Sequence, residues 1–242
     1  MSFEREVFQT ALETGLKAWD LEEFTPSLPA FADFAESVVE TNQTLNLTRI
    51  VEPEEMAIKN FLDSLAVLRL EWPQSVSCLD LGTGAGFPGV PLAIVKREWS
   101  FVLLDSLRKR LRFLQGTATS QGLTNLGTLH ARAEDAGQDK THRQGYDLVL
   151  SRAVAHLPVL LELATPLTRV GGRFVAYKGS EAVAELKASS QAMKELNLDV
   201  ELVFDIDLPL EMGARTLLVF RKLRPTPPSY PRKAGIPNKQ PL

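Results

Sequence analysis

Cysteine and histidine are scarce in this chain of 242 residues, which contains one Cys and three His. The single thiol, Cys78, cannot form an intrachain disulfide. His130, His142 and His156 are far apart in the sequence and match no metal-ligand spacing. We therefore expect neither a disulfide-stabilised secreted protein nor a bound metal.

Long apolar runs are also missing. No segment approaches the roughly 18 consecutive apolar residues of a membrane span, and the first residues lead into an amphipathic pattern without a signal-peptide core. With 44% hydrophobic and 24% charged residues, the composition is close to the globular average. We expect a cytoplasmic protein with one domain-sized core and a smaller subdomain.

Acidic residues are absent from the C-terminal end of the chain. Residues 1–211 contain 20 Lys and Arg against 30 Asp and Glu, whereas residues 212–242 contain 7 Lys and Arg and no acid. The net charge of -3 therefore combines an acidic body with a basic tail. Such a net charge does not argue against a nucleic-acid partner.

Helical periodicity dominates the first 70 residues. Apolar residues recur at three- and four-residue steps in 3–19, 31–39 and 53–68, and Pro53 suits a first helical turn. These patterns predict three helices in an N-terminal helical subdomain, residues 1–72.

Short apolar runs alternate with helical patterns after residue 77. The predicted strands are 78–81, 101–104, 126–130, 146–150, 173–177, 200–206 and 216–222, and the predicted helices are 88–96, 107–121, 157–169 and 181–196. The alternation predicts a parallel sheet covered on both faces, whereas the last two strands are joined by a loop too short for a helical crossover and should pair antiparallel.

The predicted fold is therefore α/β and Rossmann-like, with a seven-stranded, mostly parallel sheet and a C-terminal antiparallel hairpin in residues 73–223. Class I methyltransferases that use S-adenosylmethionine have this arrangement. Residues 224–242 form a basic, proline-rich C-terminal arm, which we expect to be extended because it lacks apolar periodicity.

A glycine-rich loop, D-L-G-T-G-A-G-F-P-G, occupies residues 80–89 between a predicted strand and a predicted helix. Glycines let the backbone turn sharply beside a ligand, and the helix N-terminus offers unpaired N–H groups, which is typical of a nucleotide-type site. Residues 84–89 also fit G-x-G-x-x-G with Asp105 downstream, so an NAD-dependent oxidoreductase stays open. Asp80, two residues before the first glycine, and the terminal hairpin favour S-adenosylmethionine.

Polar side chains stand where three predicted strands end. Asp105 either accepts hydrogen bonds from the ribose hydroxyls of an adenosine or caps the next helix. Glu134 either frames an adenine or is a surface acid. Arg152 either faces a methyl-transfer centre or forms an ion pair with Asp80 or Asp63.

Several short segments occur in the order seen in the RsmG family, also called GidB. They are N-L-T at 46–48, F-L-D-S-L at 61–65, the glycine loop, L-D-S-L-R-K-R at 104–110, S-R-A-V-A at 151–155 and Y-K-G at 177–179. The chain resembles this family from about residue 42 to its end, including T-P-P-S-Y-P-R-K at 226–233. The resemblance implies an S-adenosylmethionine-dependent methyltransferase that acts on N7 of a guanine in the position-527 loop of 16S rRNA.

The same resemblance implies a set of cofactor-binding residues. They are Gly82, Phe87, Asp105, Ser106, Leu107, Ala133, Glu134 and Arg152. One position departs from the family, because Asn60 stands where most members have His before F-L-D-S. An amide does not titrate, so the role of Asn60 must be hydrogen bonding and not proton transfer.

Guanine N7 has a lone pair that is free at neutral pH, so its attack on a sulfonium methyl needs no general base. The enzyme must instead hold the reacting atoms in line, which can contribute about 7 to 11 kcal/mol. We expect Arg152 and Lys178, at strand ends, to orient the guanine or its phosphate.

The target guanine must be unstacked or in a loop, because side chains cannot read the deep major groove of an RNA helix. The candidates for phosphate contact are Arg108, Lys109, Arg110, Arg112, Arg221, Lys222, Arg224, Arg232, Lys233 and Lys239. The first four could equally form a solvated helix face.

The expected partner is 16S rRNA, which could be naked, part of an assembly intermediate or part of the small ribosomal subunit. We expect no membrane partner, and an oligomer is not required. A non-catalytic RNA-binding assembly factor is the second alternative.

Overall fold

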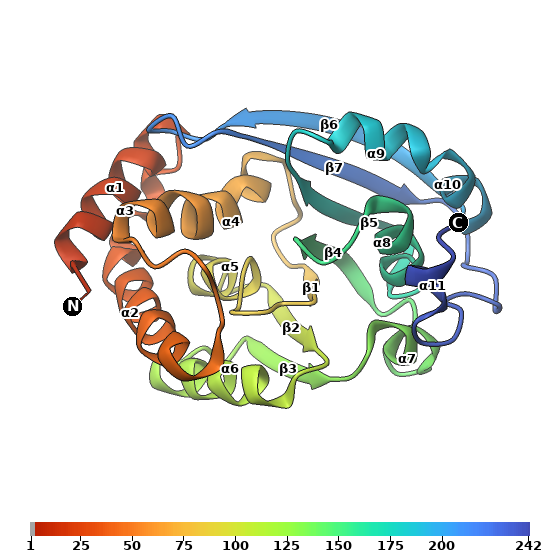
Figure 1. Ribbon diagram of the computed structural model, residues 1–242, viewed down its shortest axis with the longest axis horizontal. Coiled ribbons are helices and arrows are strands. Elements are labelled where there is room, and N and C mark those ends of the chain that lie inside the picture. Colours follow the sequence, from red (N-terminus) through yellow and green to blue (C-terminus); the bar gives the residue numbers. More distant parts are fainter. Residues whose placement is uncertain (1–2) are drawn as a thin grey trace.

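A seven-stranded sheet forms the centre of the computed structural model, which describes residues 3–242 (Figure 1). Its strands are β1 (Ser77–Leu81), β2 (Ser100–Asp105), β3 (Leu126–His130), β4 (Tyr146–Arg152), β5 (Thr168–Lys178), β6 (Leu198–Asp207) and β7 (Ala214–Lys222). The order across the sheet is β3-β2-β1-β4-β5-β7-β6. β7 runs antiparallel to β5 and β6, and all other neighbours are parallel, which confirms the predicted fold class.

The central strands are apolar because both of their faces are covered. Leu79 of β1 lies beside Val102 of β2 and Val149 of β4, and β1 is buried along most of its length. The chain moves outward from β1 to β3 and then returns to place β4 on the other side of β1. Loops diverge at this reversal, at the carboxyl ends of the strands, where open α/β sheets bind their ligands.

Two groups of helices cover the sheet, one on each face (Figure 1). One group contains α1 (Arg5–Ala18), α2 (Leu28–Leu45), α5 (Gly89–Val95) and α6 (Arg108–Ser120), and the other contains α7 (Ala133–Gln138), α8 (Leu157–Ala164), α9 (Ala182–Ala188) and α10 (Ser190–Leu196). The helix predicted at 157–169 ends earlier because Thr168 already belongs to β5, and α7 was not predicted. None of the helices within residues 3–242 is long and apolar enough to cross a membrane.

The segment predicted as a third N-terminal helix is not a uniform α-helix. It consists of α3 (Pro53–Met56), the π-helical turn η2 (Ala57–Leu62), α4 (Asp63–Leu65) and the 3-10 turn η3 (Ala66–Arg69). A further 3-10 turn, η1 (Glu22–Ser27), precedes α2. Wide π turns are often found at functional sites, and η2 contributes contacts to the site described below.

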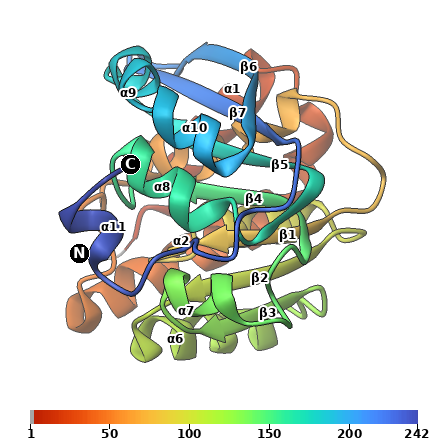
Figure 2. The ribbon, with the colours of Figure 1, turned by 90° about the vertical axis from the view of Figure 1, so that its right-hand side faces the viewer.

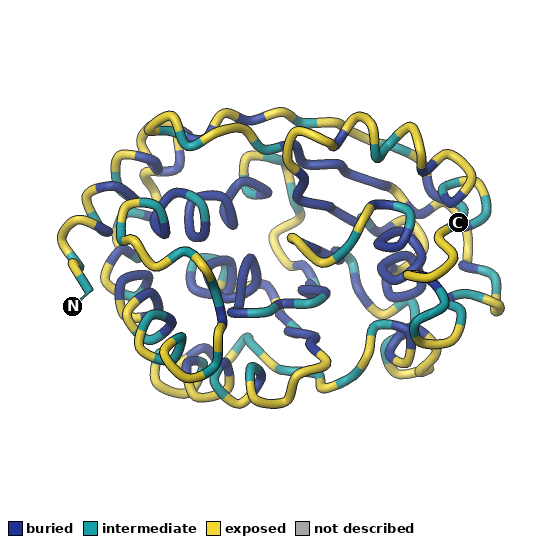
Figure 3. Tube along the Cα trace, in the orientation of Figure 1, coloured by how far each residue is buried: buried dark blue, intermediate teal, exposed yellow. Residues whose placement is uncertain are grey.

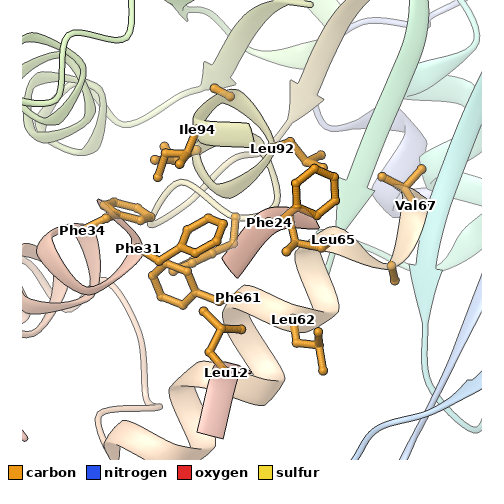
Figure 4. Close-up of a cluster of buried hydrophobic side chains, with 14 of the residues drawn as sticks. Leu12, Phe24, Phe31, Phe34, Phe61, Leu62, Leu65, Val67, Leu92 and Ile94 are labelled. Carbon is orange, nitrogen blue, oxygen red and sulfur yellow. The ribbon is translucent and has the colours of Figure 1, made fainter. Parts of the chain in front are cut away.

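The N-terminal helices and one face of the sheet share a single hydrophobic core (Figure 4). Phe61 lies at its centre, with ring centroids 4.9 Å from Phe8, 5.7 Å from Phe31 and Phe34, and 5.2 Å from Phe87. These rings meet edge to face, the favoured geometry for aromatic pairs. Because Phe87 belongs to the glycine loop, the helices before the sheet directly support that loop.

The C-terminal region differs from the expected extended arm. After β7 the chain runs back along α8 towards α7 and ends near the short helix α11 (Ile236–Lys239) (Figure 2). Thr226, Pro231 and Pro237 are buried within it, and the burial trace shows this alternation of buried and exposed positions (Figure 3). The region docks through individual polar contacts and prolines, which leave no periodic signal in the sequence.

Candidate active site

A pocket of about 350 Å³ opens at the carboxyl edge of the sheet, where the glycine loop lies. Leu81 at the end of β1, Asp105 at the end of β2, and Ala131 and Ala153 just after β3 and β4 all line it. Leu104 and Leu163 add apolar surface to a lining in which polar surface predominates. Within residues 3–242, no group of three or more His, Cys, Asp or Glu side chains is placed to hold a metal ion.

The glycine loop adopts a backbone that favours glycine. Gly82, Gly84 and Gly86 have φ of +71°, +59° and +103°. Gly82 lines the pocket, and a Cβ at this position would lie 2.6 Å from a side-chain carbon of Val154. Its missing side chain therefore lets the glycine loop and the loop after β4 approach each other at the pocket.

Asp80 holds the glycine loop in this conformation. Its Oδ2 accepts hydrogen bonds from the Thr83 hydroxyl at 2.6 Å and the Gly89 backbone N–H at 2.9 Å. Burial raises the pKa of the Asp80 carboxyl to about 6. Asp80, the acid predicted two residues before the first glycine, therefore stabilises the loop through hydrogen bonds and is only 1% exposed to solvent.

Asp105 lies at the end of β2, the position predicted for a ribose-binding carboxylate. Its oxygens accept hydrogen bonds from Gly84 N–H at 3.1 Å and Leu107 N–H at 2.8 Å, and the Arg110 guanidinium lies 3.5 Å away. The predicted helix cap is not formed, because α6 begins at Arg108 with Leu107 as its N-cap and has no side-chain capping hydrogen bond; the contact to Leu107 closes a turn before the helix. The bond to Gly84 ties the glycine loop to the end of β2.

Glu134 also lines the pocket, at the start of α7. Its side chain is largely buried, and Oε1 accepts a hydrogen bond of 2.9 Å from the backbone N–H of Gly235. Asn238 from α11 also lines this pocket. The C-terminal region therefore reaches the predicted site, a contact for which the sequence offered no signal.

Arg152 lies behind the pocket and not in its wall. Its Nη1 donates to the Lys59 carbonyl at 2.8 Å and to Asp63 Oδ2 at 3.0 Å, and Nη2 donates to Asn60 Oδ1 at 3.3 Å. The guanidinium also stacks over the Phe87 ring, 5.2 Å from its centroid. Of the two acids that could pair with Arg152, the structure selects Asp63.

Asn60 is buried beside this guanidinium. Its Oδ1 accepts from Arg152, whereas its Nδ2 is buried without a hydrogen-bond partner in the described part of the chain. Asn60 therefore has the expected hydrogen-bonding role through its carbonyl oxygen, but not through its amide nitrogen.

Lys178 is also held by neighbours within the protein. Its ammonium lies 2.7 Å from Glu185 Oε2 and donates to the Ala155 carbonyl at 2.9 Å. Glu185 in turn accepts from the Leu157 N–H, so this pair fixes the loop after β4. Lys178 is 8% exposed and supports the wall of the pocket that contains Ala153 and Val154.

The other predicted cofactor residues divide into two sets. Ser106 and Ala133 line the pocket. Leu107 is exposed, and Phe87 is buried in the aromatic cluster, so neither side chain is part of the pocket wall formed by the described residues.

The predicted RNA-contacting cations differ in their exposure. Arg108, Lys109, Arg112, Arg221, Arg224, Lys233 and Lys239 are exposed. Lys222 is fully buried and donates to the Thr165 and Thr168 carbonyls, at 2.8 and 2.7 Å, so its expected phosphate contact is excluded. Arg232 is committed to Glu162, 2.6 Å away and fully buried. Sequence patterns could not separate these cations because their partners are distant in the chain.

Comparison with known proteins places the chain in a family. The family GidB, rRNA small subunit methyltransferase G, matches residues 27–207. The chain belongs to the GidB family. Among similar proteins, ribosomal RNA small subunit methyltransferase G of Desulforamulus reducens is 45% identical over 214 residues, 88% of this chain and 89% of that protein. The protein of the same name from Listeria monocytogenes serotype 4b is 41% identical over 239 residues, 98% of each chain.

Solved structures agree with this placement at the level of fold. NSun6 from Pyrococcus horikoshii with SFG, an S-adenosylmethionine analogue, superposes with a TM-score of 0.53 at 14% identity, over 67% of this chain and 51% of that one. The fold is that of class I methyltransferases, and S-adenosylmethionine is the implied methyl donor.

The pocket residues fit this cofactor. Apolar side chains such as Leu104 and Leu163 can flank an adenine, and the Asp105 carboxylate can accept from ribose hydroxyls. Gly82 also lines the pocket and, because it has no side chain, lets a ligand approach the backbone there. The lining carries the carboxylates of Asp105 and Glu134 together with the guanidinium groups of Arg110 and Arg132, so acids and cations are balanced in the pocket wall.

Proposed function

We propose that this protein transfers a methyl group from S-adenosylmethionine to N7 of a guanine in the position-527 loop of 16S rRNA. The observation that carries the proposal is the pocket with Asp105 at the carboxyl edge of the sheet, in a chain that belongs to the GidB family. The relatives named ribosomal RNA small subunit methyltransferase G support rRNA as the substrate. An rRNA substrate also supports a cytoplasmic location.

The proposed reaction requires positioning more than acid–base chemistry. S-adenosylmethionine, when bound, supplies an electrophilic methyl group on a sulfonium. The N7 lone pair of guanine forms the new N–C bond while the C–S bond breaks, and positive charge moves to the purine without a proton transfer in the same step. A fixed polar pocket and correct alignment are therefore the main requirements.

Asp105, Glu134, Gly82, Ser106 and Ala133 are the proposed cofactor-binding residues of the pocket wall. Asp105 and Gly84 share a hydrogen bond, so the group proposed to hold the ribose also sets the position of the glycine loop. The hydrogen bond between Asp105 and Gly84 therefore supports a fixed position of the bound cofactor, and so of its methyl group, relative to the end of β4.

Arg152 and Lys178 are proposed as positioning residues. Arg152 connects the end of β4 with Lys59, Asn60 and Asp63, and Lys178 braces the loop after β4 through Glu185. Both side chains already have protein partners, which supports an indirect role in shaping the guanine site. Exposed cations of α6 and of the C-terminal region remain the proposed contacts to RNA phosphates.

The deciding experiment maps 7-methylguanosine in 16S rRNA. Small subunits and naked 16S rRNA from a strain lacking the gene are incubated with the protein and S-adenosylmethionine, and the modified base is located by chemical cleavage. We expect one new cleavage site in the 527 loop with wild type and none with Asp105→Ala. Methylation elsewhere would contradict the proposal.

Calorimetry separates the alternative functions. Binding of S-adenosylmethionine without binding of NAD is expected. Binding of NAD alone would favour the oxidoreductase that the G-x-G-x-x-G match left open. Tight rRNA binding without cofactor binding or methylation would favour a non-catalytic assembly factor.

A further inference from the structure

The last residues of the chain lie against the pocket that we assign to the cofactor. From β7 the chain passes α8, and α11 lies close to α7 and α8 in both views (Figures 1 and 2). The family match ends at residue 207, so it assigns no role to this segment. The Listeria monocytogenes relative aligns over 98% of the chain, which shows that the segment is not peculiar to this protein.

A buried ion pair anchors the segment. Glu162 of α8 is fully buried, and its carboxylate accepts from the Arg232 backbone N–H at 2.8 Å, from Nε at 2.9 Å and from Nη2 at 2.6 Å. Bidentate pairs of this kind define orientation as well as distance. Arg232 is therefore held in one geometry just before the residues that reach the pocket.

Backbone contacts reinforce this anchor. Arg143 donates to the carbonyls of Tyr230 and Thr226, at 2.8 and 3.0 Å, and Gln138 donates to the carbonyl of Pro231 at 2.9 Å. A Cβ on Gly137 would lie 2.8 Å from the Pro231 ring, so the glycine in α7 permits close contact. The segment is thus a docked part of the fold on both sides of Pro231.

The docked segment then supplies groups to the pocket. The Gly235 N–H donates to Glu134 Oε1 at 2.9 Å, and Asn238 lines the same pocket as Glu134 and Asp105. Asn238 is exposed, so its carboxamide can turn towards a bound ligand without breaking a packed core.

We propose that the segment 231–239 completes the cofactor pocket, and that the Asn238 carboxamide recognises the adenine edge. A carboxamide presents one acceptor and two donors, which matches the amino group and ring nitrogen of adenine, the pairing that Asn and Gln make with this base. Gly235 orients Glu134 at the same end of the pocket. This inference depends on the assignment of the pocket to S-adenosylmethionine made above.

Calorimetry without RNA tests the proposal, with the full-length protein and S-adenosylmethionine as ligand. We expect Asn238→Ala to weaken binding by about tenfold, from the loss of one or two neutral hydrogen bonds. Lys239→Ala, its neighbour on α11, should bind as wild type does, because Lys239 is exposed and does not line the pocket. Equal affinities of the two variants would overturn the proposal.

Base specificity gives a second readout that loss of folding would not produce. Wild type should bind S-adenosylhomocysteine more tightly than S-inosylhomocysteine, which lacks the 6-amino group, and Asn238→Ala should reduce this preference. An unchanged preference would contradict adenine recognition by Asn238.

One control variant, Asp105→Ala, separates this proposal from the assignment of the pocket. If Asp105→Ala binds S-adenosylmethionine as tightly as wild type, the pocket itself is wrongly assigned. If Asp105→Ala loses binding while Asn238→Ala retains it, only the proposal for the C-terminal segment fails.

Discussion

The guanidinium of Arg152 and the carboxylate of Asp63 lie 3.0 Å apart and connect the end of β4 with the helices that precede the sheet. Asp63 is fully buried, and its other oxygen lies 2.7 Å from Arg215 Nε of β7. One carboxylate therefore holds two cations that come from different strands. This arrangement links the N-terminal helices to the edge of the sheet where the pocket opens.

Loss of the Asp63 charge should destabilise the protein. Asp63→Asn keeps the size of the side chain but leaves two partly buried arginines without a counter-charge, so we expect the free energy of unfolding to fall by about 3 kcal/mol. Urea denaturation measures this change. Glu201→Gln is the matched control, because its pair with Arg173 is more exposed and should contribute about 1 kcal/mol or less. Equal effects would contradict a special role for Asp63.

The glycine loop should not tolerate a side chain at Gly86. Its φ is +103°, and a Cβ would lie 2.7 Å from Leu114 and 2.8 Å from Val90 side-chain atoms. We expect Gly86→Ala to lower stability by about 2 kcal/mol or more. Gly116→Ala should instead raise stability by about 0.5 to 1 kcal/mol, because Gly116 lies within α6 with no atom within 4 Å of an added Cβ. Thermal unfolding should move in opposite directions for the two variants.

Lys222 should make stability depend on pH. Burial lowers the pKa of its ammonium from 10.5 to about 7, with a smaller contribution from the nearby Arg143 charge. Between these values the unfolded chain binds the proton that the folded chain has lost, so the free energy of unfolding rises with pH from about 7 towards 10.5. The contribution is lost as the pH falls through about 7. Urea denaturation at several pH values between about 7 and 10.5 measures the free energy of unfolding of wild type and of Lys222→Met. The free energy should rise with pH more steeply for wild type, and parallel pH dependences of the two proteins would refute the prediction.

Each exposed cation of the C-terminal region should contribute its own phosphate contact to RNA binding. Replacing Arg224, Lys233 and Lys239 by Gln should weaken 16S rRNA binding and make the plot of log K against log salt less steep by about 0.7 for each lost phosphate contact. Filter binding at several salt concentrations measures the slope. Lys222→Met removes a buried cation and should leave the slope unchanged, whereas an unchanged slope in the triple variant would exclude this region from the RNA contacts.

Local patterns in the sequence were sufficient for the strands and for the glycine loop. Alternation of apolar runs with helical periodicity predicted seven strands at the places along the chain where they occur, because strands buried on both faces must be apolar along their length. The order of the strands across the sheet was not predicted. The break of the third predicted helix into a π turn was not predicted; the contacts made at this turn, from Phe61 to Phe87 and from Lys59 to Arg152, involve residues distant in the sequence.

The sequence by itself determined the fold class, the nucleotide-type loop and the position of Asp105 at a strand end, since these follow from periodicity and from glycine's conformational freedom. Only the tertiary structure decided that Arg152 pairs with Asp63, that Lys222 is buried and that the C-terminal segment docks on Glu162 and reaches Glu134. Each of these contacts joins residues more than 50 positions apart. Such pairings depend on how the helices and strands pack, and short-range patterns carry no information about them.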